Sequence, residues 1–473
     1  MKRLTSLDFW RGIAIFFTAM FHFLFTSWDK FSDPNSILGS GNIGLILLAA
    51  FIFIFIHWRG FFLMISAVVN FYQLENAVKN GKNLWGVWGK QLFAGLILIL
   101  VGKLWVTVFP YWGFVEIWSR QIPIGSVPIS DIWASHWDMF FLIEAIESIG
   151  LMMIVTSFFF LLFQLFKGKY SWMIKMAVCY VIGIVIIAIS PIVGDWATNV
   201  VGIDITMLEG FRAVSPGVYF HDVFTTLGDF FNNFGLVMYR VAMNWISGRE
   251  APLFPMMASY FFGAGIAYVI LQDEPKRKHL RWMCLPSLLA VIWGAAEFLF
   301  IHDGGFLNGA ALDLGFHIHP RWFAFVSFGL QAPLILALLS WVEFNPRINE
   351  QRWLKGTRWI RRFGVFALTV YFLGILDFIL RFLMSVIVPS GAGADFISRY
   401  GLNAMWTWIT VAILMLIWTF GLFAWDRIAR GYGSFEFFLS LLKIPKAGRK
   451  RDWKDPIGLR GSLWDVEMVS YVK

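Results

Sequence analysis

An arginine and a histidine, Arg11 and His22, lie eleven residues apart in the first hydrophobic segment of the chain. Eleven helical residues make three turns plus about 20°, so both side chains share one helix face, roughly 16 Å apart along the axis. Ionisable groups are costly in hydrocarbon and normally face a cavity or a partner. An arginine can bind phosphate through its planar donor fork, and a neutral imidazole can act as a base or a nucleophile.

A structural role for both residues stays open. His22 could hydrogen-bond to a neighbouring helix, and Arg11 could anchor the helix end at the membrane surface. Asp8 lies three residues before Arg11 and can pair with it, or it can cap the helix together with Ser6.

The composition indicates a membrane protein. The chain is 58% hydrophobic and 15% charged, against about 25% charged residues in soluble domains. Its two cysteines both lie in apolar runs, so a disulfide framework is excluded. The sequence predicts an all-α polytopic protein of about ten transmembrane helices. Their predicted ranges are 9–27, 48–70, 91–109, 139–166, 173–191, 253–272, 282–301, 322–344, 364–388 and 403–425.

The basic residues predict the topology. Of the 39 Lys and Arg residues, 28 fall in segments on the side of the N-terminus and 7 in the opposite segments. By the positive-inside rule both termini are cytoplasmic, in a plasma or inner membrane. Because topology accounts for the net charge of +9, and no nucleic-acid or nucleotide motif is present, we expect no nucleic-acid partner.

Two outer loops are long, residues 110–138 and 192–252, and they mix Trp, Tyr, Gly, Asp and His. We expect them to form a structured extracytoplasmic cap that contains short interfacial helices, one of them around residues 223–246. The predicted organisation is one transmembrane domain, 1–425, and a basic cytoplasmic tail, 426–473, held at anionic headgroups.

The residues around Arg11 resemble a family motif. The run Ser-Leu-Asp-x-x-Arg-Gly-x-Ala-Ile at residues 6–15, followed by His22, is similar to the opening helix of transmembrane acyltransferases. These include the acyltransferase-3 family and the branch of the heparan-α-glucosaminide N-acetyltransferases. Residues 59–67 resemble a Phe-Phe-x-x-Ser-Gly segment of these families, with Ala67 in place of the usual glycine. Residues 251–255 and 362–373 resemble later motifs of the N-acetyltransferase branch.

The resemblance implies transfer of a short acyl group from cytoplasmic acyl-CoA, most simply acetyl-CoA, to the other side of the membrane. The acceptor would be a hydroxyl or amine of an extracytoplasmic sugar, glycan or envelope molecule. Arg11, Arg59 and Ser66 are then assigned to donor binding, and His22 to catalysis as base or acyl carrier.

Other charged residues in the apolar segments are rival candidates. Glu147 is the carboxylate that we expect to orient His22, since a histidine base is usually fixed by a second group. His57 and Arg59 interrupt an apolar run and form a rival site, or else mark a surface boundary. Asp377 and Arg381 have the spacing of a neutralising pair on one helix. The remaining candidates are Glu144 and Glu297.

No metal is predicted. His302, Asp303, His317 and His319 are loosely spaced and complete no zinc signature. Tryptophans of the outer loop 110–138 could stack on a sugar, but tryptophan is also typical of the membrane interface.

Two other functions remain open. A transporter could line its path with Arg59, Glu144, Glu147 and the pair at 377 and 381, although no internal repeat is visible. The chain could also be a non-catalytic subunit of a larger membrane complex, or a homodimer, that keeps the acyltransferase scaffold.

Overall fold

A computed structural model describes residues 2–27, 58–108, 143–201, 234–247, 252–272, 275–301, 321–374 and 404–442, together with a few isolated positions. The chain divides into two compact units. The first unit comprises Met1–Trp58 and Ile335–Lys473, and the second comprises Arg59–Leu334.

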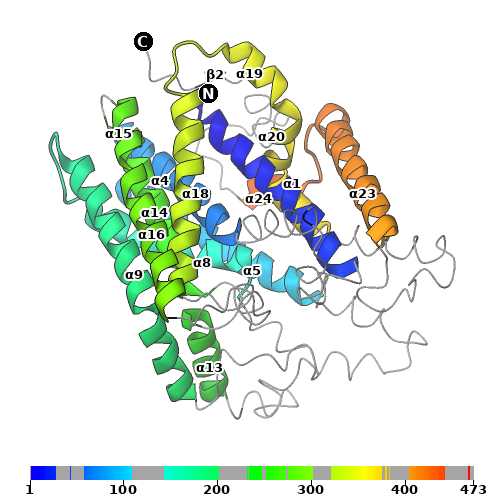
Figure 1. The fold of residues 1–473 in the computed structure, drawn as a ribbon. Helices are drawn as coiled ribbons and strands as arrows, with labels where there is room; N and C mark the ends of the chain where they lie inside the picture. The colour runs from blue at the N-terminus through cyan, green and yellow to red at the C-terminus, as the bar shows by residue number, and fades with distance from the viewer. Residues whose placement is uncertain are drawn as a thin grey trace. The chain divides into compact units, whose positions relative to one another are not determined.

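The described residues are helical apart from turns and one pair of two-residue strands, as Figure 1 shows. Among them, nine helices are long and apolar enough to cross a membrane. This confirms an all-α, integral, multi-pass membrane protein. Large apolar side chains on their outer faces agree with contact to lipid, for example Leu289, Trp293 and Phe300, which are 57%, 61% and 84% exposed.

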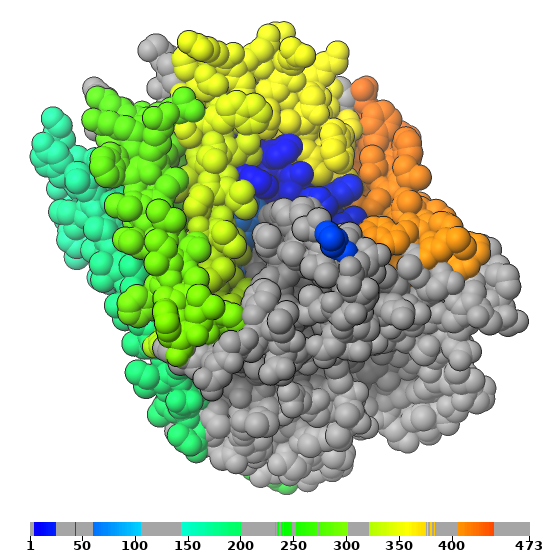
Figure 2. All heavy atoms as spheres, in the orientation of Figure 1, coloured from blue at the N-terminus to red at the C-terminus, as the bar shows by residue number. Residues whose placement is uncertain are grey.

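The first unit is built around the N-terminal helix α1 (Thr5–Ser27), which contacts α20, α21 and α23. Figure 1 shows α1 in blue beside α20 and α23, and in Figure 2 part of α1 reaches the surface. The other elements are the end of α18 (Arg321–Val342), α19 (Glu350–Gly356), α20 (Arg358–Val365), α21 (Ala367–Phe372), α23 (Ala404–Ala424), the π-helix η3 (Trp425–Ala429) and α24 (Phe435–Leu442).

Glycines set the contact between α1 and α20. A Cβ atom at Gly12 would lie 2.1 Å from the carbonyl oxygen of Ile360, and one at Gly364 would lie 2.5 Å from the carbonyl oxygen of Asp8. Small residues allow such close backbone approach between membrane helices. Two stretches that the family resemblance singles out, around Gly12 and around Gly364, therefore pack directly on one another.

Gly12→Ala is expected to destabilise the protein by about 1–3 kcal/mol, because the methyl group meets backbone that cannot rotate away. Thermal unfolding in detergent measures this change. Gly421→Ala on α23 is the matched control, since nothing lies within 4 Å of its Cβ position. Equal stability of the two variants would contradict the proposed close packing.

The second unit contains the helices α4 (Trp58–Lys79), α5 (Leu84–Val108), α8 (Ala145–Phe163), α9 (Ser171–Val201), α13 (Phe234–Ser247), α14 (Leu253–Ile270), α15 (Arg277–Trp282), α16 (Cys284–Ile301) and the first part of α18. Helix α14 is the buried centre of this unit and contacts α8, α9, α13 and α15. Gly263 of α14 allows the close approach of α4, because a Cβ there would lie 2.2 Å from the carbonyl oxygen of Met64.

One predicted span needs correction, and another is described only in part. The second span was placed at 48–70, but the helix runs from Trp58 to Lys79. Its polar end is stabilised by partners on other helices, which an apolar-window criterion cannot see. Near the start of the predicted span 364–388, α20 ends at Val365 and α21 runs from Ala367 to Phe372. Most residues of the span after Gly374 lie outside the described part of the chain, so the rest of this span stays a prediction.

Other helix boundaries also differ from the predicted ones. Helix α5 begins seven residues before the predicted position, and α9 continues through Pro191 to Val201. The helix expected near residues 223–246 is described as α13, from Phe234 to Ser247.

The tail and the outer loops are described only in part. Strands β1 (Lys2–Arg3) and β2 (Glu467–Met468) pair in parallel, so they join the two ends of the chain. Helix α24 and β2 belong to the predicted tail 426–473 and lie in the first unit. The loop 110–138 and most of the loop 192–252 lie outside the described residues, so the extracytoplasmic cap stays a prediction.

Candidate functional site

Arg11 and His22 lie on the same continuous helix, α1. The side chain of Arg11 is 31% exposed, and its Nη2 donates to Asp8 Oδ1 at 3.3 Å. His22 is half-buried, whereas its neighbours Phe21 and Phe23 are buried. The helix therefore carries a solvent-accessible guanidinium near its start and a partly accessible imidazole three turns further along.

The start of α1 is held by residues from distant parts of the sequence. The backbone N–H of Ser6 donates to Glu343 Oε1 at 3.0 Å, across 337 residues of sequence. Trp353 Nε1 donates to Thr5 Oγ1, also at 3.0 Å. These contacts and the glycine contact fix the helix on which Arg11 and His22 lie.

The carboxyl group of Glu343, which accepts the hydrogen bond from Ser6, can titrate. Its pKa is raised to about 8, mainly by burial; the nearby Asp8 acts in the same direction, and the hydrogen bonds from Ser6 oppose the rise. The folded protein therefore holds a neutral carboxyl group up to about pH 8, whereas the unfolded chain ionises near its ordinary pKa of 4.5.

The fold is therefore expected to lose stability as the pH rises from about 4.5 to 8, by up to about 1.4 kcal/mol per pH unit. Glu343→Gln keeps an acceptor for Ser6 but cannot titrate, so its stability should depend less on pH. Thermal midpoints at pH 5, 6.5 and 8 measure the effect. An unchanged pH slope in Glu343→Gln would exclude this residue as its source.

The third motif stretch, residues 362–373, is capped by an acid from the tail. Glu436 accepts from the backbone N–H groups of Leu368 and Thr369, at 2.7 and 3.2 Å, and from the Thr369 hydroxyl. Burial raises the pKa of Glu436 above its ordinary value, and these hydrogen bonds oppose part of that rise. The arrangement satisfies the first donors of α21 and fixes the break between α20 and α21.

The second motif stretch lies in the second unit, on α4. Arg59 is the second residue of this helix, and Ser66 is half-buried within it. A Cβ atom added at Gly60 would lie 3.0 Å from Ser259 Oγ. Asn70 Nδ2 donates to the hydroxyl of Tyr260 at 2.7 Å. This stretch therefore packs on α14.

Glu147 has a charged partner of its own. It is fully buried on α8 and faces Lys103 of α5, with Oε1 and Nζ 3.7 Å apart. Lys103 Nζ also lies 5.4 Å from the ring centre of Trp245. Gly102 makes room for the pair, because a Cβ at this position would lie 2.8 Å from the carboxylate carbon of Glu147.

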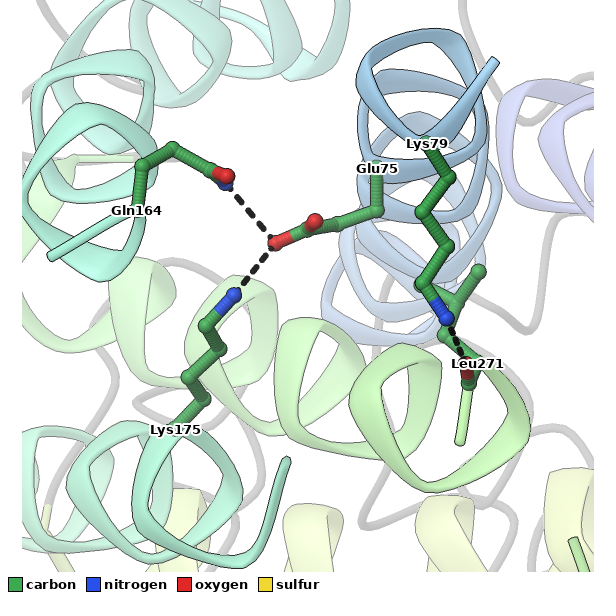
Figure 3. Close-up of polar contacts among 5 residues, drawn as sticks. All are labelled: Glu75, Lys79, Gln164, Lys175 and Leu271. Atoms are coloured by element: carbon green, nitrogen blue, oxygen red, sulfur yellow. Dashed lines mark hydrogen bonds and ion pairs between the residues drawn. The ribbon is translucent and has the colours of Figure 1, made fainter. Parts of the chain in front are cut away.

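A second polar cluster, in which Glu75 and Lys175 are buried, joins the ends of four helices in the same unit (Figure 3). Glu75 Oε1 accepts from Gln164 at 2.9 Å and from Lys175 at 3.0 Å. Lys79 Nζ donates to the carbonyl oxygen of Leu271, the residue that follows α14, at 2.6 Å. These contacts hold the ends of α4, α8 and α14 and the start of α9 together.

The structure thus places Arg11 and His22 in the first unit, and Arg59, Ser66 and Glu147 in the second. Whether Glu147 orients His22 stays a prediction. Glu144 precedes α8 as its N-cap residue, and Glu297 pairs with Arg321 at 2.8 Å. His57, Asp377, Arg381, and the four residues weighed as a metal site lie outside the described residues.

Several site residues have no signal in the sequence alone. Glu75 and Lys175 are 100 residues apart, and Arg362 and Asp426 are 64 residues apart. Of the site residues that sequence reasoning missed, only Lys103 could have been identified from the sequence as a candidate, because it is a charged residue inside an apolar run. Within the described ranges, no group of three or more His, Cys, Asp or Glu residues is placed to hold a metal ion.

Comparison of the chain with protein-family models, with curated proteins and with solved structures finds no match.

Proposed function

We propose that this protein is a membrane-bound acyltransferase that uses acyl-CoA, most simply acetyl-CoA, as donor. The observation that carries the proposal is helix α1, which is continuous from Thr5 to Ser27 and bears both Arg11 and His22. Arg11 is partly exposed and can bind donor phosphates, and the pantetheine arm is long enough to carry the thioester toward His22.

The reaction would transfer the acyl group to a hydroxyl or amine of an extracytoplasmic sugar or envelope molecule. His22 accepts the proton of the acceptor as it attacks the thioester carbonyl carbon, the C–S bond breaks, and the proton is delivered to the leaving sulfur. Alternatively, an imidazole nitrogen attacks the thioester carbonyl carbon, the C–S bond breaks and CoA leaves as its thiol. The acceptor then attacks the acyl-imidazole, the C–N bond breaks, and the acceptor's proton passes to the released imidazole. A covalent acyl adduct on the α1 peptide, detected by mass spectrometry, would distinguish the second route.

The direct test uses the purified protein in vesicles, with labelled acetyl-CoA and a panel of amino sugars and glycans. Acetylated product that depends on protein and donor would support the proposal. Absence of both product and donor binding would oppose it.

A transporter is the second candidate, and the buried Lys103–Glu147 pair favours it, because intramembrane ionisable residues commonly mark solute or proton paths. Flux of a solute without any acyl donor would select this alternative.

A further inference from the structure

Beyond α23 the chain turns back and packs on α21, within the first unit. The turn follows the π-helix η3, where Arg430 has a φ of 51° and Gly431 and Gly433 have φ values of 80° and 76°. Glycine adopts this left-handed region readily, whereas a residue with a side chain rarely does. Residues 430–433 lead directly into α24, so this turn, rather than either helix, can absorb a change in the direction of α24.

The contacts between α24 and α21 are concentrated at the start of α24. The hydroxyl of Thr369, a fully buried residue, donates to Glu436 and accepts from the backbone N–H of Phe435, the latter at 3.0 Å. Glu436 also accepts from the first backbone N–H groups of α21. The ring centres of Phe372 and Phe435 lie 4.4 Å apart. One hydroxyl therefore joins the two helices, between a carboxylate and a backbone N–H group of α24.

Helix α21 also links α24 to α1. It contacts α1 directly, and only Phe366 separates it from α20, which meets α1 at Gly12 and Gly364. Closely packed backbones do not deform continuously, so a shift of α21 changes the fit of α20 on α1. The Arg362–Asp426 pair lies before the turn at 430–433, so it holds η3 on α20 whether or not α24 is docked.

We propose that α24 is a hinged strap, which undocks from α21 as a unit about residues 430–433 and, when docked, holds the α20–α21 break against α1. A short helix attached mainly at one end opens at a lower free energy than the packed helices around it. Because α1 bears Arg11 and His22, the strap gives the tail control over the helix of the candidate site. This inference does not rest on acyl transfer, and it would stand if the protein proved to be a transporter.

The test is hydrogen–deuterium exchange of the full chain in nanodiscs, read by mass spectrometry on peptides from α24, α21, the start of α1 and α15. Thr369→Val removes the hydroxyl that joins α24 to α21 and keeps the shape of the side chain. Thr369→Ser is the matched control, because it keeps the hydroxyl. Glu436→Gln is a second variant, which removes the charge but keeps an acceptor for the N–H groups of α21.

We expect Thr369→Val and Glu436→Gln to speed exchange of the α24 and α21 amides about tenfold, with a smaller increase in α1 near Gly12. Thr369→Ser should stay within about twofold of wild type, and α15, in the second unit, should not change in any variant. Equal exchange in Thr369→Val and Thr369→Ser would overturn the strap. Faster exchange of α24 without any change in α1 would overturn its coupling to α1. Equal acceleration of α15 would show global unfolding instead of strap opening, and would also overturn the proposal.

Discussion

Replacing His22 by alanine is expected to reduce acyl transfer by about 10²–10⁴-fold, the usual contribution of a positioned acid–base group. The variant should still fold, because the contacts that hold α1 lie near its start, at Thr5, Ser6 and Gly12. Initial rates with labelled acetyl-CoA measure the loss, and thermal midpoints confirm the fold.

His22→Gln separates catalysis from structure. Glutamine can still hydrogen-bond to a neighbouring helix, but it cannot act as a base or carry an acyl group. A catalytic role predicts that His22→Gln is as inactive as His22→Ala, whereas a structural role predicts recovery. His279→Ala, on α15 of the second unit, is the control, and it should keep full activity. Transfer by folded His22→Ala at the wild-type rate would refute the assignment.

Breaking the Lys103–Glu147 pair is expected to cost about 3–5 kcal/mol, because either single substitution leaves a buried charge without its counter-charge. Lys103→Met and Glu147→Met are the single variants. The double variant, Lys103→Met with Glu147→Met, should recover most of the stability, since apolar side chains of similar volume replace the pair. Thermal unfolding in detergent measures all three.

This set of variants also discriminates between functions. If the pair is only structural, the stable double variant keeps acyl transfer. If it lines a transport path, the double variant is stable but loses flux. Single variants that unfold at the wild-type temperature would show that the pair is not the buried, coupled contact described above.

The sequence predicts helix α14 closely but misplaces helix α4. Helix α14 lies within two residues of its predicted bounds, because its apolar run is bounded by Pro252 and by the polar residues after Leu271. Helix α4 was misplaced because Glu75 and Lys79 read as residues outside the membrane until Gln164, Lys175 and Leu271 provide their partners.

The candidate site is predictable only along one helix. The spacing of Arg11 and His22 follows from helical periodicity, and it is what the structure has. That Gly12 packs against Gly364 does not follow, because it joins segments about 350 residues apart. For the same reason, the sequence does not predict the contacts of α1 with Glu343 and Trp353, or the ion pair of Arg362 with Asp426. Contacts between distant helices depend on tertiary packing, which periodicity and hydropathy do not contain.

The most direct test of the central claim is a cryo-electron-microscopy map of the protein with a non-hydrolysable acetyl-CoA analogue at saturating concentration. The proposed function predicts density along α1, with donor phosphates at Arg11 and the acyl end beside His22. An acyl end located away from His22, or no bound analogue at all, would contradict it.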